Sequence, residues 1–111
     1  MTGTVTGLTL KTSKRAAPTT ITGATGSATP NVDTYIFNYA GTVTFTLASA
    51  AMFFGREVML RTITANAVDS ASSNVVPLDS ATAGTAILSA SDGAWAVLKS
   101  DGTNWQKIAG S

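Results

Sequence analysis

The stretch Gly93-Ala-Trp-Ala-Val-Leu-Lys-Ser-Asp-Gly-Thr-Asn-Trp-Gln-Lys-Ile108 decides the fold of this 111-residue chain. Two short apolar segments, each led by a tryptophan, flank a polar turn sequence at residues 100–104. Asp101 and Gly102 are residue types that favour a tight reversal of the chain, and Trp105 begins the returning segment. The pattern predicts an antiparallel hairpin whose register is fixed by its turn and by a packed aromatic ring.

Earlier segments show the two-residue period of strands. Residues 34–47 place Tyr35 and Phe37 on one face and then alternate apolar residues with threonines, which predicts a hairpin with one apolar and one threonine face. Residues 48–54 lose the alternation and predict a crossing from one sheet to another. Residues 56–63 resume it as a strand.

The remaining segments complete an all-β pattern. Residues 65–73 predict a loop, Pro77 confines its neighbours to the edge of a sheet, and residues 86–90 form a further short strand. Short strands every 8 to 12 residues or so, with almost no helix, are typical of small sandwiches and barrels. We therefore expect an all-β fold, a small antiparallel β-sandwich or barrel with an extended N-terminal arm.

The N-terminal part of the chain differs in composition and charge. Residues 1–32 are rich in Thr, Ala and Gly and predict the arm, whereas residues 33–111 form the β-domain. Lys11, Lys14 and Arg15 give the arm a charge of +3, and four cations against six carboxylates give the remainder −2. A basic arm on a slightly acidic body suits docking on an acidic protein or on phosphate.

The residue types in the sequence argue against several classes of function. The chain has no histidine and no cysteine, which removes a Ser-His-Asp triad, a thiol nucleophile, a Cys/His zinc site and a disulfide framework. Its six carboxylates lie singly along the chain: Asp33, Glu57, Asp69, Asp79, Asp92 and Asp101. We expect no catalytic residues, no metal site and no cofactor.

The composition also bears on partners. Charged residues make up only 12% of the chain, against about 25% in typical soluble domains, and this favours an obligate homo-oligomer that covers part of its surface. The uncharged residues 16–32 are too polar for a membrane span. Three cations without interleaved aromatic residues are too few for specific nucleic-acid binding.

The chain resembles a small β-domain of tailed-bacteriophage virion proteins. The resemblance is carried by the alternating residues 42–47, the alanine-rich crossing, the sequence Gly55-Arg56-Glu57-Val58, and the closing Ser100-Asp-Gly-Thr-Asn-Trp105. The domain is found in head decoration and head fibre proteins and in tail fibre or spike modules. The resemblance covers residues 33–108, and the chain departs from the family's pattern between residues 65 and 83.

The resemblance implies a non-enzymatic virion protein on the capsid surface, made in the host cytoplasm. We expect a capsid decoration (cement) protein, a homotrimer that binds and stabilises the lattice of the major capsid protein, and the shortness of the chain favours the head over the tail. Lys11, Lys14 and Arg15 are the expected capsid contacts. The residues with structural roles in the closing hairpin are Trp95, Asp101, Gly102, Asn104 and Trp105.

The alternative is a tail fibre, spike or head fibre module that binds host surface carbohydrate. In that case Trp95 or Trp105 would stack on a sugar ring, with Asn104 and Gln106 as polar partners. A tryptophan inside an apolar strand is more often part of the core, and this favours the decoration protein.

Overall fold

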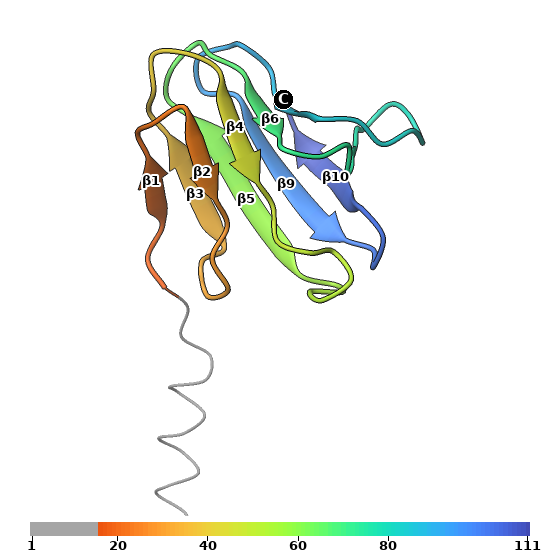
Figure 1. Ribbon diagram of the computed structural model, residues 1–111. Coiled ribbons are helices and arrows are strands. Elements are labelled where there is room, and N and C mark those ends of the chain that lie inside the picture. Colours follow the sequence, from red (N-terminus) through yellow and green to blue (C-terminus); the bar gives the residue numbers. More distant parts are fainter. Residues whose placement is uncertain (1–15) are drawn as a thin grey trace, which may run out of the picture.

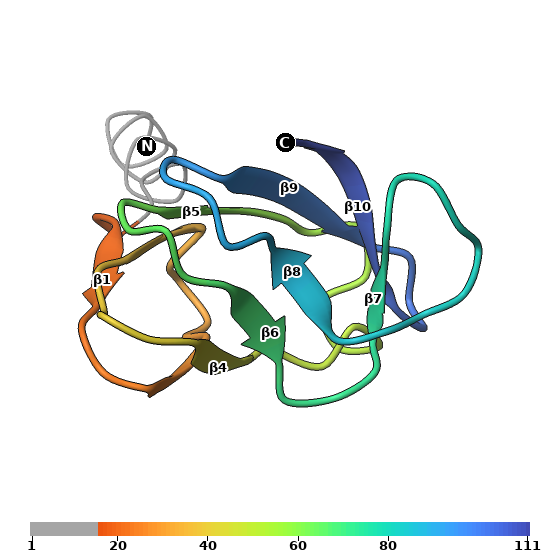
Figure 2. The same cartoon turned by 90° about the horizontal axis from the view of Figure 1, so that it is seen from above.

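The alternating segments form strands, and the strands make two sheets that face each other (Figures 1 and 2). The structure is a computed structural model that describes residues 16–111, and these form ten strands and no helix. The strands are β1 (Thr19–Ile21), β2 (Thr25–Ser27), β3 (Thr34–Phe37), β4 (Val43–Thr46), β5 (Glu57–Thr62), β6 (Val68–Ser70), β7 (Val75–Val76), β8 (Ala86–Leu88), β9 (Trp95–Ser100) and β10 (Trp105–Gly110). One sheet has the order β1-β3-β5-β9-β10-β7, and the other has the order β2-β4-β6-β8.

The first six strands wind as three similar turns. In each turn the chain runs one strand in the six-stranded sheet and the next in the four-stranded sheet (Figure 1). Tyr35 in β3 therefore lies opposite Thr19 and Leu60 in parallel pairings, and Thr44 in β4 lies opposite Thr25 and Asp69. Neighbouring strands are parallel because the chain visits the other sheet before it returns.

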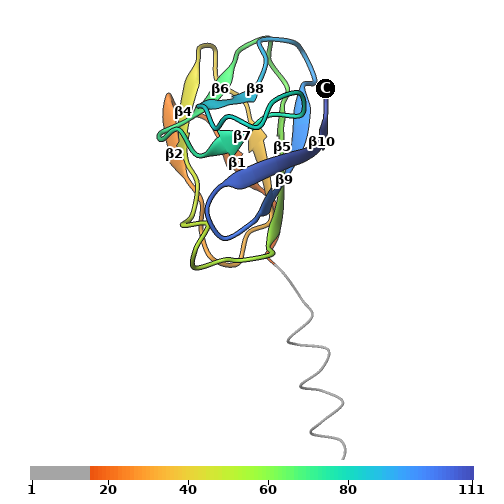
Figure 3. The same cartoon turned by 90° about the vertical axis from the view of Figure 1, so that its right-hand side faces the viewer.

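The last strands run back against these turns. β8 pairs antiparallel with β6, and β9 lies antiparallel between β5 and β10. The register of β9 and β10 shifts between Lys107 and Ala109, and the short β7 pairs parallel with β10 at the edge of the sheet. The two layers are seen from the side in Figure 3.

The core lies between the two sheets. Tyr35 and Phe37 of β3 point at Phe45 of β4, with ring centroids 4.9 and 5.3 Å apart. Leu60 and Leu98 add fully buried side chains from the neighbouring strands. Residues with the two-residue period thus bury one face and expose the other, as the sequence indicates.

The all-β class is confirmed, but the expected antiparallel arrangement is wrong for most of the strand pairings. Three of the eight strand pairings are antiparallel, and the other five are parallel. The expected hairpin of residues 34–47 is also wrong, because β3 and β4 belong to different sheets. The predicted loop of residues 65–73 contains β6. Periodicity shows which face of a strand is buried but not which strand lies beside it.

The predicted arm, residues 1–32, is replaced in part by regular structure. Residues 19–27 contain β1 and β2, each of which forms the edge of one sheet. Ile21 supplies a large side chain that packs against the core, and Gly26 allows that contact, since a Cβ at residue 26 would lie 3.0 Å from Cγ2 of Ile21. Residues 1–15 lie outside the described residues.

Candidate functional site

The described chain begins at one end of the molecule, at the bottom of Figure 1. We call this end the base, and it consists of residues 28–33, 47–56 and 101–104. The backbone N–H of Ala16 donates to the carbonyl of Asn31 over 3.2 Å, and this places the start of the described chain at the base. Lys11, Lys14 and Arg15, the predicted capsid contacts, lie just before this point and outside the described residues.

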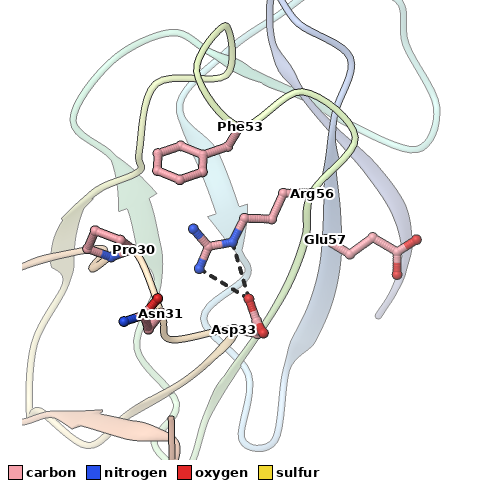
Figure 4. A pocket seen from close by; sticks show the side chains of 6 residues that line it. All are labelled: Pro30, Asn31, Asp33, Phe53, Arg56 and Glu57. Carbon is pink, nitrogen blue, oxygen red and sulfur yellow. Dashed lines mark hydrogen bonds and ion pairs between the residues drawn. The ribbon is translucent and has the colours of Figure 1, made fainter. Parts of the chain in front are cut away.

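Arg56 ties two loops of the base together. Its Nε lies 3.2 Å and its Nη2 3.1 Å from Oδ1 of Asp33, and Nη2 also donates to the carbonyl of Val32 over 2.7 Å (Figure 4). The ring of Phe53 covers the guanidinium at 4.9 Å. Only 13% of the Arg56 side chain is exposed, so this ion pair is a structural link rather than a free recognition group.

A shallow open hollow of about 480 Å³ lies beside this ion pair. The residues that line it come from the two loops and from the start of β5: Pro30, Asn31, Asp33, Phe53, Arg56 and Glu57. Figure 4 shows the Glu57 side chain directed away from the Arg56–Asp33 pair. The two carboxylates therefore do not face each other as a general acid and base would.

Two large apolar side chains project from the base. Met52 is 79% exposed and Phe54 is 76% exposed, both in the turn between β4 and β5, and we call this pair the apolar tip. Exposed apolar side chains that stand close together form the kind of surface that contacts another molecule when the patch is large enough. One signal of this exposure is visible in the sequence: three consecutive large residues, Met52-Phe53-Phe54, cannot all point inward from one turn.

The apolar tip is held by the closing hairpin. The N–H of Gly55 donates to the carbonyl of Ser100 over 2.9 Å, and the hydroxyl of Ser100 donates to the carbonyl of Ala50 over 2.6 Å. Phe54 packs on Gly102, where a Cβ would lie 2.9 Å from its Cδ1. The tip is therefore a fixed feature of the base and not a loose loop.

The closing hairpin forms as the sequence predicts. Asp101 accepts backbone N–H donors of Thr103 and Asn104 at Oδ1, over 2.8 and 2.7 Å, and the amide of Gln106 at Oδ2 over 2.8 Å. These bonds, that of Asn104 above all, lower the pKa of Asp101 from its ordinary value of 3.8. Gly102 has φ of +93°, which completes the reversal.

The expected sugar-stacking residues are not brought together. Trp105 is 1% exposed and donates its indole N–H to Ala48, and Gln106 is engaged by Asp101. Trp95 is 37% exposed but lies at the other end of β9 from Asn104, about 17 Å away along the strand. Of the two tryptophans, only Trp95 offers a surface to a ligand.

Neither a metal centre nor a membrane-spanning helix is found in the described part of the chain. Within residues 16–111 no three carboxylates lie close enough to hold a metal ion, and no helix is long and apolar enough to cross a membrane. Comparison with protein-family models, with curated proteins and with solved structures gave no match. The base is therefore the feature of the described chain that bears on function.

Proposed function

We propose that the protein is a non-enzymatic virion component of a tailed bacteriophage, a homo-oligomeric capsid decoration protein that binds the major capsid protein through its base. The proposal is supported by the resemblance of residues 33–108 to virion β-domains and by the chemistry of the base. It assigns the protein to the capsid surface after synthesis in the host cytoplasm.

The observation that carries the proposal is the position of Met52 and Phe54. Both project from the end of the body at which the described chain begins at Ala16, and Lys11, Lys14 and Arg15 precede that point in the sequence. Burial of each apolar side chain on a partner contributes about 1.5 to 3 kcal/mol. The cations add attraction to an acidic surface, which is strongest at low salt.

Repetition on a lattice strengthens such a contact. A homo-oligomer presents one base per copy, so that several modest contacts act together once the first has formed. The resemblance implies three copies. Their bases would contact several of the repeated capsid subunits at once. A small base on each copy is therefore sufficient for stable attachment.

The test is saturable binding to phage heads stripped of accessory proteins, with intact host cells as the second target. The decoration role predicts saturation on heads at a fixed number of copies per capsid subunit. The double variant M52S/F54S should lose affinity about tenfold or more, while L78S, at an exposed leucine outside the base, should bind as the parent does. Equal binding by all three proteins would exclude the apolar tip from the contact.

A separate variant tests whether the basic segment contacts the capsid. The triple variant K11A/K14A/R15A should occupy fewer sites at physiological salt, and its binding should depend less on salt than that of the parent. Unchanged occupancy would remove these cations from the capsid contact.

A second function is favoured by the exposed indole of Trp95. As part of a tail fibre, spike or head fibre, the protein would stack this ring on host surface carbohydrate. Saturable binding to cells but not to heads, lost in W95A, would support this function and contradict the first.

A further inference from the structure

The outer face of the six-stranded sheet mixes apolar side chains with charged ones such as Glu57, Arg61 and Lys99, and no strand of the described chain lies on it. Side chains at alternate positions of this sheet point away from the core. The apolar ones among them are Ile36, Met59, Ile63, Trp95, Val97 and Ala109. The outer face of the four-stranded sheet is different, since Thr25, Thr44 and Thr46 are exposed there. The two faces of one small body therefore differ in what they can bind.

The charged groups on this outer face have a regular arrangement. In the register of β5 and β9, Arg61 lies opposite Trp95, Met59 opposite Val97, and Glu57 opposite Lys99. Arg61 and Glu57 thus stand about 7 Å to either side of Met59 on one strand. Glu57 contacts Lys99 over 3.6 Å, whereas Arg61 forms no ion pair with the described residues.

We propose that two copies of the chain pair through this face, about a two-fold axis that lies in the plane of the contact and crosses the strands at Met59 and Val97. The axis reverses each strand against itself, so Arg61 faces Glu57 of the partner subunit and Trp95 faces Lys99 of the partner subunit. Each copy then supplies to the other a carboxylate for Arg61, which has no ion pair among residues 16–111, and a cation for the indole face.

Self-complementarity of this kind favours a second copy as the occupant. A two-fold contact uses the same patch on both subunits, so its charges must match when the patch is rotated onto itself. Here opposite charges meet at one pair of positions, a cation meets an aromatic ring at the other, and no like charges meet. The apolar row between them supplies Met59 against Met59 and Val97 against Val97.

The size of the face predicts a modest affinity. The six strands of this sheet hold 27 residues, which at about 3.3 Å per residue and about 4.8 Å between strands give a face of roughly 400 Å² per copy. Stable interfaces bury about 800 Å² per partner. The pair should therefore form at high protein concentration and dissociate on dilution.

This contact uses none of the apolar tip and stands apart from the proposed function, so either can fail alone. It also gives two copies, whereas the family resemblance implies three. Sedimentation equilibrium of the full chain, at concentrations up to about 0.1 mM, distinguishes a two-copy from a three-copy assembly. Twice the mass of one chain supports the pair, while a single-chain or three-chain mass would overturn it.

Charge reversal tests the orientation. R61E and E57R alone should each weaken pairing about tenfold, because each places like charges opposite each other twice in the pair. The double variant R61E/E57R should return to within about threefold of the parent. T44E, on the other sheet, is the control and should pair normally. A double variant that pairs no more tightly than the single variants would contradict the proposed axis.

A thiol on the axis gives an independent readout in a chain without cysteine. Facing sheets lie about 10 Å apart, too far for a direct disulfide but within reach of a short bis-maleimide. M59C should give a covalent dimer whose yield falls on dilution, and T44C should stay single. Equal yields from both would overturn the pairing through this face.

Discussion

Trp105 donates its indole N–H to the backbone carbonyl of Ala48 over 2.9 Å, across 57 residues of sequence. Trp105 begins β10, and Ala48 lies in the crossing between β4 and β5. Ser100 makes a second bond to the same crossing through Ala50. The closing hairpin thus fixes the segment that carries the apolar tip, and stability of the body is linked to the shape of the base.

Loss of the Trp105 ring should destabilise the protein strongly. W105A removes a buried ring and its hydrogen bond and should cost about 3 to 5 kcal/mol, whereas W105F keeps most of the ring and should cost about 1 to 3. The free energy of unfolding in urea measures both. W95F, at the partly exposed tryptophan, is the control and should change it by under about 1 kcal/mol. A larger loss in W95F than in W105F would contradict the assigned burial.

Replacement of Arg56 should loosen the base. R56A removes contacts to Asp33 and Val32 and should cost about 2 to 3 kcal/mol, less than the roughly 3 to 5 of a fully buried pair because a third of the Asp33 side chain is exposed. R56K should lie between, since one ammonium cannot replace both nitrogen contacts. Urea unfolding gives these values.

The matched control for Arg56 is Arg61. R61A removes an exposed arginine that has no ion pair among the described residues, so it should change the stability of the dilute protein by under about 0.5 kcal/mol. Equal effects at the two positions would mean that the Arg56–Asp33 contact contributes nothing measurable.

The Asp101 turn should make stability depend on pH in the acid range. The folded-state pKa of Asp101 lies below its ordinary value of 3.8, so the carboxylate contributes stability at higher pH. That contribution declines as the pH falls below 3.8 and is lost as it passes through the folded-state pKa. The difference in melting temperature between the parent and D101N should therefore be constant near neutral pH and shrink in acid.

A matched variant controls for general acid effects in the pH experiment. D79N changes an exposed aspartate that takes part in none of the side-chain hydrogen bonds found in residues 16–111. Its difference from the parent should show a weaker acid dependence than that of D101N. If D79N showed the stronger dependence, the turn would not be the source of the effect.

The sequence allowed prediction of local structure better than of topology. The hairpin of Asp101 and Gly102 is local, and its turn residues bond to their own neighbours. The parallel pairing of Tyr35 with Leu60 joins residues 25 positions apart, and nothing near either residue encodes it. Threonines next to apolar residues suit parallel and antiparallel pairing alike, so the strand order was not predictable.

The candidate site was predictable only in part. Lys11, Lys14 and Arg15 were evident as a cluster of charge, but they lie outside the described residues and their role as capsid contacts stays a prediction. Exposure of Met52 and Phe54 depends on how the crossing meets the hairpin 50 residues later, which composition does not show. Gly102 is the clearest case of a residue whose role depends on a distant segment, since it contacts the ring of Phe54.

A side chain at Gly102 should destabilise the protein, for two separable reasons. Its φ of +93° is unfavourable for alanine by about 1 to 2 kcal/mol, and the added Cβ would also press on the ring of Phe54. G102A should therefore lower the free energy of unfolding by at least that amount. The double variant G102A/F54A, compared with F54A alone, should show only the backbone part, because the contacting ring is gone. G84A, where a Cβ meets nothing within 4 Å, should be neutral or stabilise by about 0.4 to 1 kcal/mol. If G102A cost the same with and without Phe54, the contact between the tip and the hairpin would carry no strain, and the φ angle alone would explain the glycine.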